Sequence, residues 1–125
     1  AIGAEYQILD DELHPVAKLG KDGNRTVASL YDLIASKKDA RAFKPIGQWN
    51  TGRILARKDG QVTYFLNGIP LVDFVRGSDE FRKLVAGSKY KEWRRFGEAP
   101  KGHILIQDHG NEVSFRSIKI KNLSK

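Results

Sequence analysis

The strongest constraint on the fold lies in the middle of the chain, in the stretch WNTGRILARKDGQVTYFLNGIPLVDFV, residues 49–75. Apolar and polar side chains alternate through it in three runs, the pattern of strands with one buried face. The runs are separated by KDGQ and NG, where Gly60 and Gly68 supply the positive φ that tight hairpin turns need. The stretch therefore predicts a meander of three antiparallel strands.

Two more strands are predicted near the C-terminus, in GHILIQDHGNEVSFRSIKI, residues 102–120. The polar run DHGNE turns the chain between them. In a regular strand over residues 113–120, the apolar side chains of Val113 and Ile118 would point to opposite faces of the sheet. We expect an extra residue near Arg116–Ser117, a β-bulge, to restore the phase.

Other segments are less regular. Residues 5–9, EYQIL, predict a strand with Tyr6 and Ile8 on one side, and residues 26–36 fit either a short helix or a bent strand. From Ser78, a suitable helix cap, the period changes, and residues 78–97 predict a short helical or irregular insert.

These patterns predict an all-β fold of two packed antiparallel sheets, in a single domain over residues 1–125. Alternation places six side chains on the core face: Tyr6, Ile8, Ile54, Ala56, Ile104 and Ile106.

Composition excludes several kinds of site and partner. The chain has no cysteine, which rules out disulfides and thiolate metal sites, and no apolar run of about 18 residues that could span a membrane. No signal peptide is visible. The net charge of +7 would suit an acidic polymer, but lysine and arginine are spread evenly and no basic-aromatic stripe appears, so we expect no nucleic-acid partner.

Motifs for other chemistries are weak or absent. There is no Gly-x-Ser-x-Gly and no phosphate-binding loop, and the three histidines lack a zinc-ligand spacing. The acidic run LDDE, residues 9–12, fits a calcium site less well than a solvated turn.

The face opposite the predicted core carries an unusual set of polar groups. Amides, a carboxylate, a guanidinium and an imidazole are common in sugar sites, with aromatic platforms such as Trp49 and Trp93 beside them. Glu5 is the clear candidate for a catalytic carboxylate, and Asp10, Asp11 or Asp108 could be the second that a glycosidase needs. Alternatively, QDHG is only a turn in which Asp108 accepts backbone N–H groups. The set comprises Glu5, Gln7, Arg53, Gln107 and His109.

Four segments resemble one known family along residues 3–123: EYQILDD, GQWNTGRILARKDGQVTYFLNG, VAGSKYKEWRRFG and KGHILIQDHGNEVSFRSIKIKNL. The family is the 3-keto-disaccharide hydrolase domain, formerly described as a domain of unknown function or a glycosyl hydrolase. The resemblance implies a concanavalin A-like jelly-roll sandwich, a carbohydrate substrate oxidised at C3, and a periplasmic or cell-surface location. Members carry further strands before the segment that matches EYQ, so we expect this chain to be the C-terminal portion of the domain. Its partner strands would come from the N-terminal portion or from a second copy.

Chemistry on a 3-keto-glycoside suggests roles for these residues. His109 would be the base that removes the proton at C2, with Glu5 as the second catalytic group. Gln7 and Gln107 would hold sugar hydroxyls or a divalent metal, although no cofactor is clearly indicated. Rival interpretations are a non-catalytic, lectin-like carbohydrate-binding module and an interaction domain for an acidic polymer. Three further substrate-binding residues are predicted: Arg53 for the developing charge, Asp108 to orient the loop and Trp49 to stack on the sugar.

Overall fold

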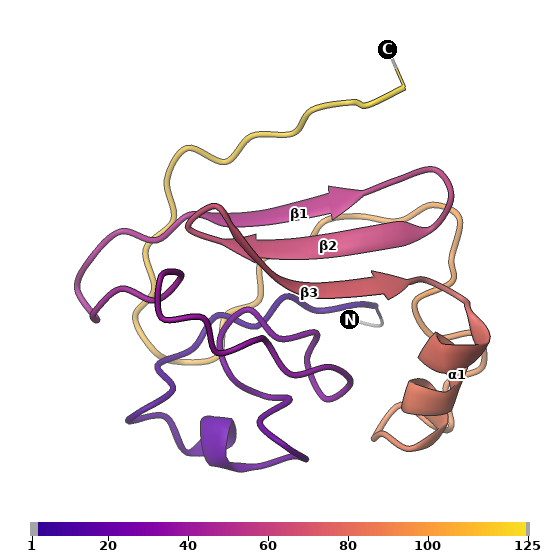
Figure 1. Cartoon of the computed structure of the whole chain (residues 1–125), viewed down its shortest axis with the longest axis horizontal. Coiled ribbons are helices and arrows are strands. Elements are labelled where there is room, and N and C mark those ends of the chain that lie inside the picture. The colour runs from indigo at the N-terminus through magenta and orange to yellow at the C-terminus, as the bar shows by residue number, and fades with distance from the viewer. Residues whose placement is uncertain (1–2, 125) are drawn as a thin grey trace.

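A three-stranded antiparallel sheet forms the centre of the computed structural model, which describes residues 3–124. Its strands are β1 (Gly52–Ala56), β2 (Gln61–Leu66) and β3 (Ile69–Val75), in the order β1-β2-β3 (Figure 1). The meander predicted from the alternating pattern is therefore confirmed. The described helices are a 3-10 turn, η1 (Pro15–Lys18), and α1 (Asp79–Ala86).

Both predicted hairpin turns are present. Gly60 has φ 92° between β1 and β2. Between β2 and β3, Asn67 and Gly68 have φ values of 50° and 83°, the pair of positive values that a type I′ turn requires. This turn twists in the same sense as the strands, so it joins them without splaying the sheet.

One face of the sheet is covered by loops from before β1 and by the segment that follows β3. Tyr64, at the centre, is 2% exposed and packs edge-on against Phe74, with ring centroids 5.7 Å apart. Burying one such aromatic ring contributes roughly 2–3 kcal/mol to the free energy of unfolding. The main cluster comprises Leu30, Leu33, Val62, Tyr64, Val72, Phe74, Phe81 and Phe96.

The predicted helical insert is confirmed by α1. The Ser78 hydroxyl accepts a hydrogen bond from the Phe81 backbone N–H at 3.1 Å, which caps the helix. Phe81 is 1% exposed and its ring stacks on that of Phe74, so it fixes the helix against the sheet.

The N-terminal segment is held by a few long-range hydrogen bonds rather than by a ladder. Tyr6 forms only an isolated bridge with Leu30, so the predicted strand over residues 5–9 is wrong. The Tyr6 hydroxyl donates to the Phe65 carbonyl at 2.8 Å and ties the segment to β2. Residues 26–36 form a series of turns, neither the helix nor the bent strand.

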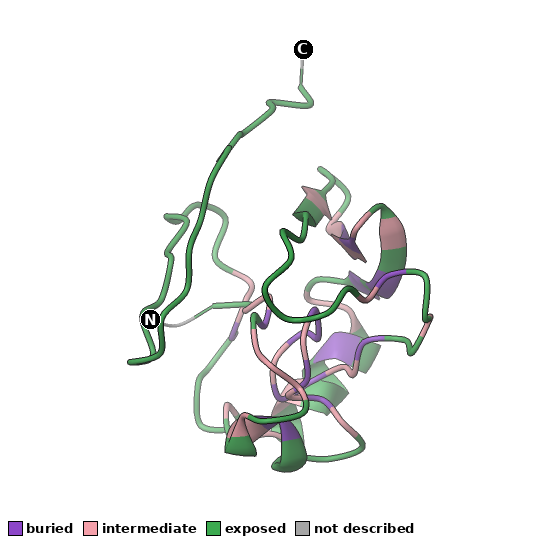
Figure 2. Cartoon of the chain, turned by 90° about the vertical axis from the view of Figure 1, so that its left-hand side faces the viewer, coloured by how far each residue is buried: buried purple, intermediate pink, exposed green. Residues whose placement is uncertain are grey.

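Residues 101–124, the C-terminal arm, form no strand although they run extended, so the predicted second hairpin is wrong for the chain as described. Every residue of the arm is exposed, and Figure 2 shows it as extended stretches along one side of the body. Ser117 has φ 55°, so the backbone is irregular at the position where a β-bulge was predicted. No bulge forms, because the segment has no partner strand among the described residues. A strand requires a neighbour, and residues 3–124 supply none here.

The predicted core face is wrong for five of its six members, because Ala56 and the four isoleucines are exposed and only Tyr6 is partly buried. Ile8, Ile54, Ile104 and Ile106 are each at least half exposed, at 52%, 55%, 78% and 50%. Ile54 does share a face with Tyr64, its partner in the β1–β2 register. β1 is an edge strand, however, and the covering loops leave it exposed along almost all its length. Residues 3–124 thus form one sheet with one short α-helix and long loops.

Candidate functional site

Glu5 is the centre of the candidate site. Its carbonyl accepts a hydrogen bond from the Tyr31 backbone N–H at 3.1 Å, which fixes the backbone, and its side chain is half-buried. Burial raises the pKa of the Glu5 carboxyl, while the nearby positive charges of Lys89 and His109 oppose that rise. A carboxyl with a raised pKa keeps its proton closer to neutral pH, as a general acid must.

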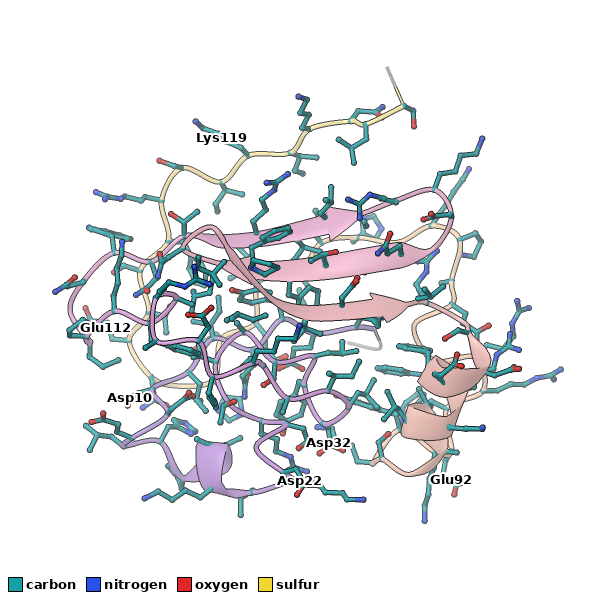
Figure 3. All side chains as sticks on the ribbon, in the orientation of Figure 1. Asp10, Asp22, Asp32, Glu92, Glu112 and Lys119 are labelled. Carbon is teal, nitrogen blue, oxygen red and sulfur yellow. The ribbon has the colours of Figure 1, made fainter. Side chains whose placement is uncertain are left out.

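His109 reaches the site from the bend of the C-terminal arm. Its ring packs edge-on to His14, with centroids 5.9 Å apart and planes at 63°. His14 is held at the start of η1, where its Nδ1 accepts from the Val16 N–H at 3.2 Å. Figure 3 shows Glu112, at the same bend, on the side of the molecule that carries Asp10. The bend is therefore attached to the N-terminal loops rather than to the sheet.

The turn interpretation of QDHG is confirmed for Asp108, whose Oδ1 accepts from the Gly110 N–H at 2.8 Å. Its carboxylate stabilises the bend that presents His109.

Lys89 is a residue of the site that the strand patterns did not suggest. Its Nζ lies 4.2 Å from the centroid of the Tyr31 ring and 5.1 Å from that of Tyr90, and each ring attracts the cation. Its backbone N–H donates to Asp32 Oδ2 at 3.0 Å. Asp32 in turn pairs with Arg25 at 2.7 Å, so an ion pair in the loops positions the Lys89 backbone.

Two tyrosines near Glu5 complete the surroundings. Burial raises the pKa of both Tyr64 and Tyr90, and the Glu5 carboxylate raises it further in each case. Both hydroxyls therefore stay protonated at neutral pH and can donate hydrogen bonds. Tyr90 also stacks on Phe96 with centroids 4.0 Å apart, which fixes its ring.

Two predicted substrate-binding residues are not brought to Glu5. Gln7 is 8% exposed, and its Nε2 donates to the Arg25 carbonyl at 3.2 Å, so the structure uses this amide to hold the loops. Arg53 lies over the Phe65 ring at 5.1 Å. Since successive side chains of β2 point to opposite faces, Arg53 is on the face of the sheet away from Tyr64.

The remaining predicted residues lie at the periphery. Gln107 is exposed on the arm. Trp49 is 47% exposed, and the Arg116 guanidinium covers its ring at 3.9 Å from the centroid. Asp10 accepts from the backbone N–H groups of Glu12 and Leu13, an acidic turn satisfied within the chain.

A shallow hollow of about 370 Å³ borders the bend of the arm and is lined by Leu13, His14, Pro15 and Asn111. Within residues 3–124, no three histidine or acidic side chains gather closely enough to hold a metal ion. The same part of the chain contains no helix of the length and hydropathy needed to cross a membrane.

Sequence reasoning missed Lys89 and Tyr64 for different reasons. Tyr64 has the parity of the core residues Val62 and Leu66, so alternation marked it as packing. Lys89 sits in a basic and aromatic insert that is typical of a solvated face. The adjacent Tyr90 was the available signal, because an aromatic anchor beside a lysine restricts where that lysine can point.

The chain is similar to known proteins in sequence and in structure. Residues 1–121 match the 3-keto-alpha-glucoside-1,2-lyase-like domain. A curated relative from Bacteroides thetaiotaomicron, named 3-keto-disaccharide hydrolase, is 38% identical over 129 aligned residues, which cover 95% of this chain and 43% of that protein. A crystal structure of a provisionally named glycosyl hydrolase from Parabacteroides distasonis superposes with a TM-score of 0.62 at 26% identity, over 78% of this chain and 44% of that one. The chain thus spans less than half the length of these two proteins.

Proposed function

Because the chain belongs to the 3-keto-alpha-glucoside-1,2-lyase-like domain family, we propose that it acts in the cleavage of 3-keto-glycosides by elimination across C1 and C2. The observation that carries the proposal is the half-buried Glu5, whose carboxyl has a raised pKa and lies close to the Lys89 ammonium and to the His109 imidazole. An acid, a base and a fixed cation are the groups that such an elimination requires.

The chemistry follows from the ketone at C3, which acidifies the hydrogen at C2. His109 removes that proton, and the electron pair of the C2–H bond forms an enolate whose negative charge lies on the C3 oxygen. When the enolate collapses, a C1–C2 double bond forms and the C1–O bond breaks. Glu5 donates its proton to the departing glycosidic oxygen. Addition of water at C1 with a proton at C2 then gives the free 3-keto sugar, which is net hydrolysis.

Each residue's surroundings suit its role. His109 is exposed at a bend, so its ring can meet a substrate. The raised pKa of Glu5 suits an acid. Lys89, which is held by the Tyr31 and Tyr90 rings, is a fixed cation for the enolate oxygen. We assign stabilisation of the enolate oxygen to Lys89 rather than to Arg53, because Arg53 lies on the face of the sheet away from Tyr64.

The complete domain proposed for this function is a jelly-roll sandwich, of which the β1–β3 meander is one part. The relatives' greater length and the TM-score of 0.62 to a longer glycosyl hydrolase-like chain support this.

Turnover of a 3-keto-disaccharide by the purified protein tests the proposal, followed as release of the two monosaccharides. We expect His109→Ala to lower the rate by roughly 10²–10⁴-fold, the usual contribution of a positioned acid or base, and Glu5→Gln to act in the same direction. Lys91→Ala, an exposed lysine two residues from Lys89, is the matched control and should retain the wild-type rate. Binding without turnover in the wild type would favour the lectin-like alternative, and full activity in His109→Ala would remove that residue from its role.

A further inference from the structure

Tyr31 lies between the group proposed to donate a proton and the group proposed to stabilise the enolate. Its backbone N–H donates to the Glu5 carbonyl at 3.1 Å, and the centroid of its ring lies 4.2 Å from Lys89 Nζ. One residue therefore contacts both Glu5 and Lys89, which are far apart in the sequence. The proposed reaction assigns no step to Tyr31, yet its contacts link the acid to the cation.

The Tyr31 ring is itself restrained. The Arg25 guanidinium carbon lies 5.3 Å from the centroid of the ring, and a guanidinium at this distance attracts it. Arg25 is held by its ion pair with the carboxylate of Asp32, the next residue in the chain, at 2.7 Å. The Asp32 N–H donates to the Asn24 carbonyl at 2.9 Å. These contacts fix the ring before any ligand binds, so the site is preorganised.

The backbone of Lys89 is fixed by the same part of the chain. Asp32 Oδ2 accepts from the Lys89 N–H at 3.0 Å, and the Asp32 side chain is only 8% exposed, so this hydrogen bond is shielded from water. Asp32 has φ 63°, a left-handed conformation that persists where surrounding contacts hold it. Figure 3 shows Asp32 among the loops below the sheet. Tyr31 and Asp32 thus supply a ring for the ammonium and a carboxylate for its backbone.

Lys89 depends on such contacts because it is exposed. An ammonium on a flexible four-carbon stem moves freely in water unless another group restrains it. The rings of Tyr31 and Tyr90, the latter at 5.1 Å, attract the cation without neutralising it, whereas a carboxylate partner would cancel its charge. The positive charge therefore stays available for a negative charge that develops on a ligand.

We propose that Tyr31 is a positioning residue whose ring holds the Lys89 ammonium at a fixed place beside Glu5. The inference rests on the proposed function, in which Lys89 stabilises the enolate oxygen. A misplacement of about 1 Å can cost roughly 100-fold in rate. Loss of the ring should therefore lower kcat by roughly 10- to 100-fold and leave KM close to the wild-type value, because the enolate forms only after the substrate has bound.

Titration of the Glu5 carboxyl by NMR tests the position of Lys89 without any substrate. The Lys89 charge lowers the pKa of Glu5. Without the ring that charge moves into water, so Tyr31→Leu should raise the pKa of Glu5, in the same direction as Lys89→Met and by a smaller amount. Loss of packing alone would admit water to Glu5 and lower its pKa, so the two explanations differ in sign. Tyr31→Phe keeps the ring and is the matched control, which should titrate and turn over like the wild type.

The wild-type protein offers a second measurement that needs no variant and so does not depend on whether Tyr31→Leu folds. The ε-CH₂ protons of Lys89 should resonate upfield of those of Lys91, an exposed lysine two residues away, because the Lys89 ammonium lies over two aromatic rings.

Three results would overturn the positioning role of Tyr31. They are Lys89 protons that resonate with those of Lys91, a pKa of Glu5 that stays unchanged or falls in Tyr31→Leu, and a wild-type kcat in that variant. A wild-type protein that leaves 3-keto-disaccharides intact would instead refute the proposed function, and the two NMR measurements would still show whether the ring holds Lys89.

Discussion

Replacing Asp32 tests how the loops hold the candidate site together. Its carboxylate is 8% exposed, pairs with Arg25 at 2.7 Å and accepts from the Lys89 N–H at 3.0 Å. Asp32→Ala removes both interactions and leaves the Lys89 N–H without its partner. It also places alanine at φ 63°, where aspartate is better tolerated.

The expected loss can be worked out from these contacts. Hydrogen bonds to a charged group contribute about 1.5–3 kcal/mol each, and the partly exposed Arg25 lowers its share. The left-handed backbone adds roughly 1 kcal/mol, so Asp32→Ala should lose about 3–4 kcal/mol of unfolding free energy. Asp32→Asn keeps one acceptor and tolerates the φ value, so it should lose only about 1–2 kcal/mol.

Urea denaturation measures the difference. With a slope of roughly 2 kcal/mol per molar urea, Asp32→Ala should lower the midpoint by roughly 1.5–2 M and Asp32→Asn by roughly 0.5–1 M. Asp39→Ala breaks a more exposed pair, in which the Arg41 side chain is 75% exposed, and should lower the midpoint by much less than Asp32→Ala. If all three variants shared one midpoint, the Arg25–Asp32–Lys89 linkage would have no energetic part in the fold.

Three more predictions follow from the described contacts. Gly68→Ala places a side chain at φ 83° in the β2–β3 turn and should cost roughly 1–2 kcal/mol in the same assay, whereas Gly3→Ala should cost nothing measurable. Ser78→Ala removes the cap of α1 and should cost about 1 kcal/mol, with a Thr replacement restoring most of it. Because the pKa of Glu5 is raised on folding, its ionisation destabilises the fold as pH rises from the unfolded pKa through the folded one. Glu5→Gln should therefore match the wild type well below pH 4.5 and unfold at a higher urea concentration than the wild type at pH 7; an equal difference at both pH values would contradict this.

The sheet was predictable because its information is local. Each strand of the meander alternates, and Gly60 and Gly68 mark the turns that connect neighbours in sequence. Register follows directly from such short connections.

The arm was not predictable because its information is non-local. The alternation around Ile104 and Ile118 indicates strands, and the arm is indeed extended, but a strand forms only where another segment pairs with it. The predicted burial of Ile54 was wrong for the same reason. The sequence of β1 does not show whether another segment covers its face or pairs with its outer edge.

The candidate site was predictable only in part. Parity brought Glu5 and His109 into one hypothesis, and their charges do interact in the structure. The same parity mispositioned Gln7, because residues 5–9 are held by hydrogen bonds to residues 25–31 instead of a strand ladder. Lys89 depends on Asp32, 57 residues earlier, a pairing that no local pattern contains.

The measurement that tests the account most directly is cleavage of a 3-keto-disaccharide in D₂O, with the hydrogen at C2 of the released 3-keto sugar followed by NMR. Elimination and re-addition of water predict that deuterium enters C2 in step with turnover, above the exchange seen without enzyme. In His109→Ala both the release of the sugar and the incorporation of deuterium should be lost. Cleavage that releases the sugar with its original C2 hydrogen would contradict proton abstraction by His109 and the elimination itself.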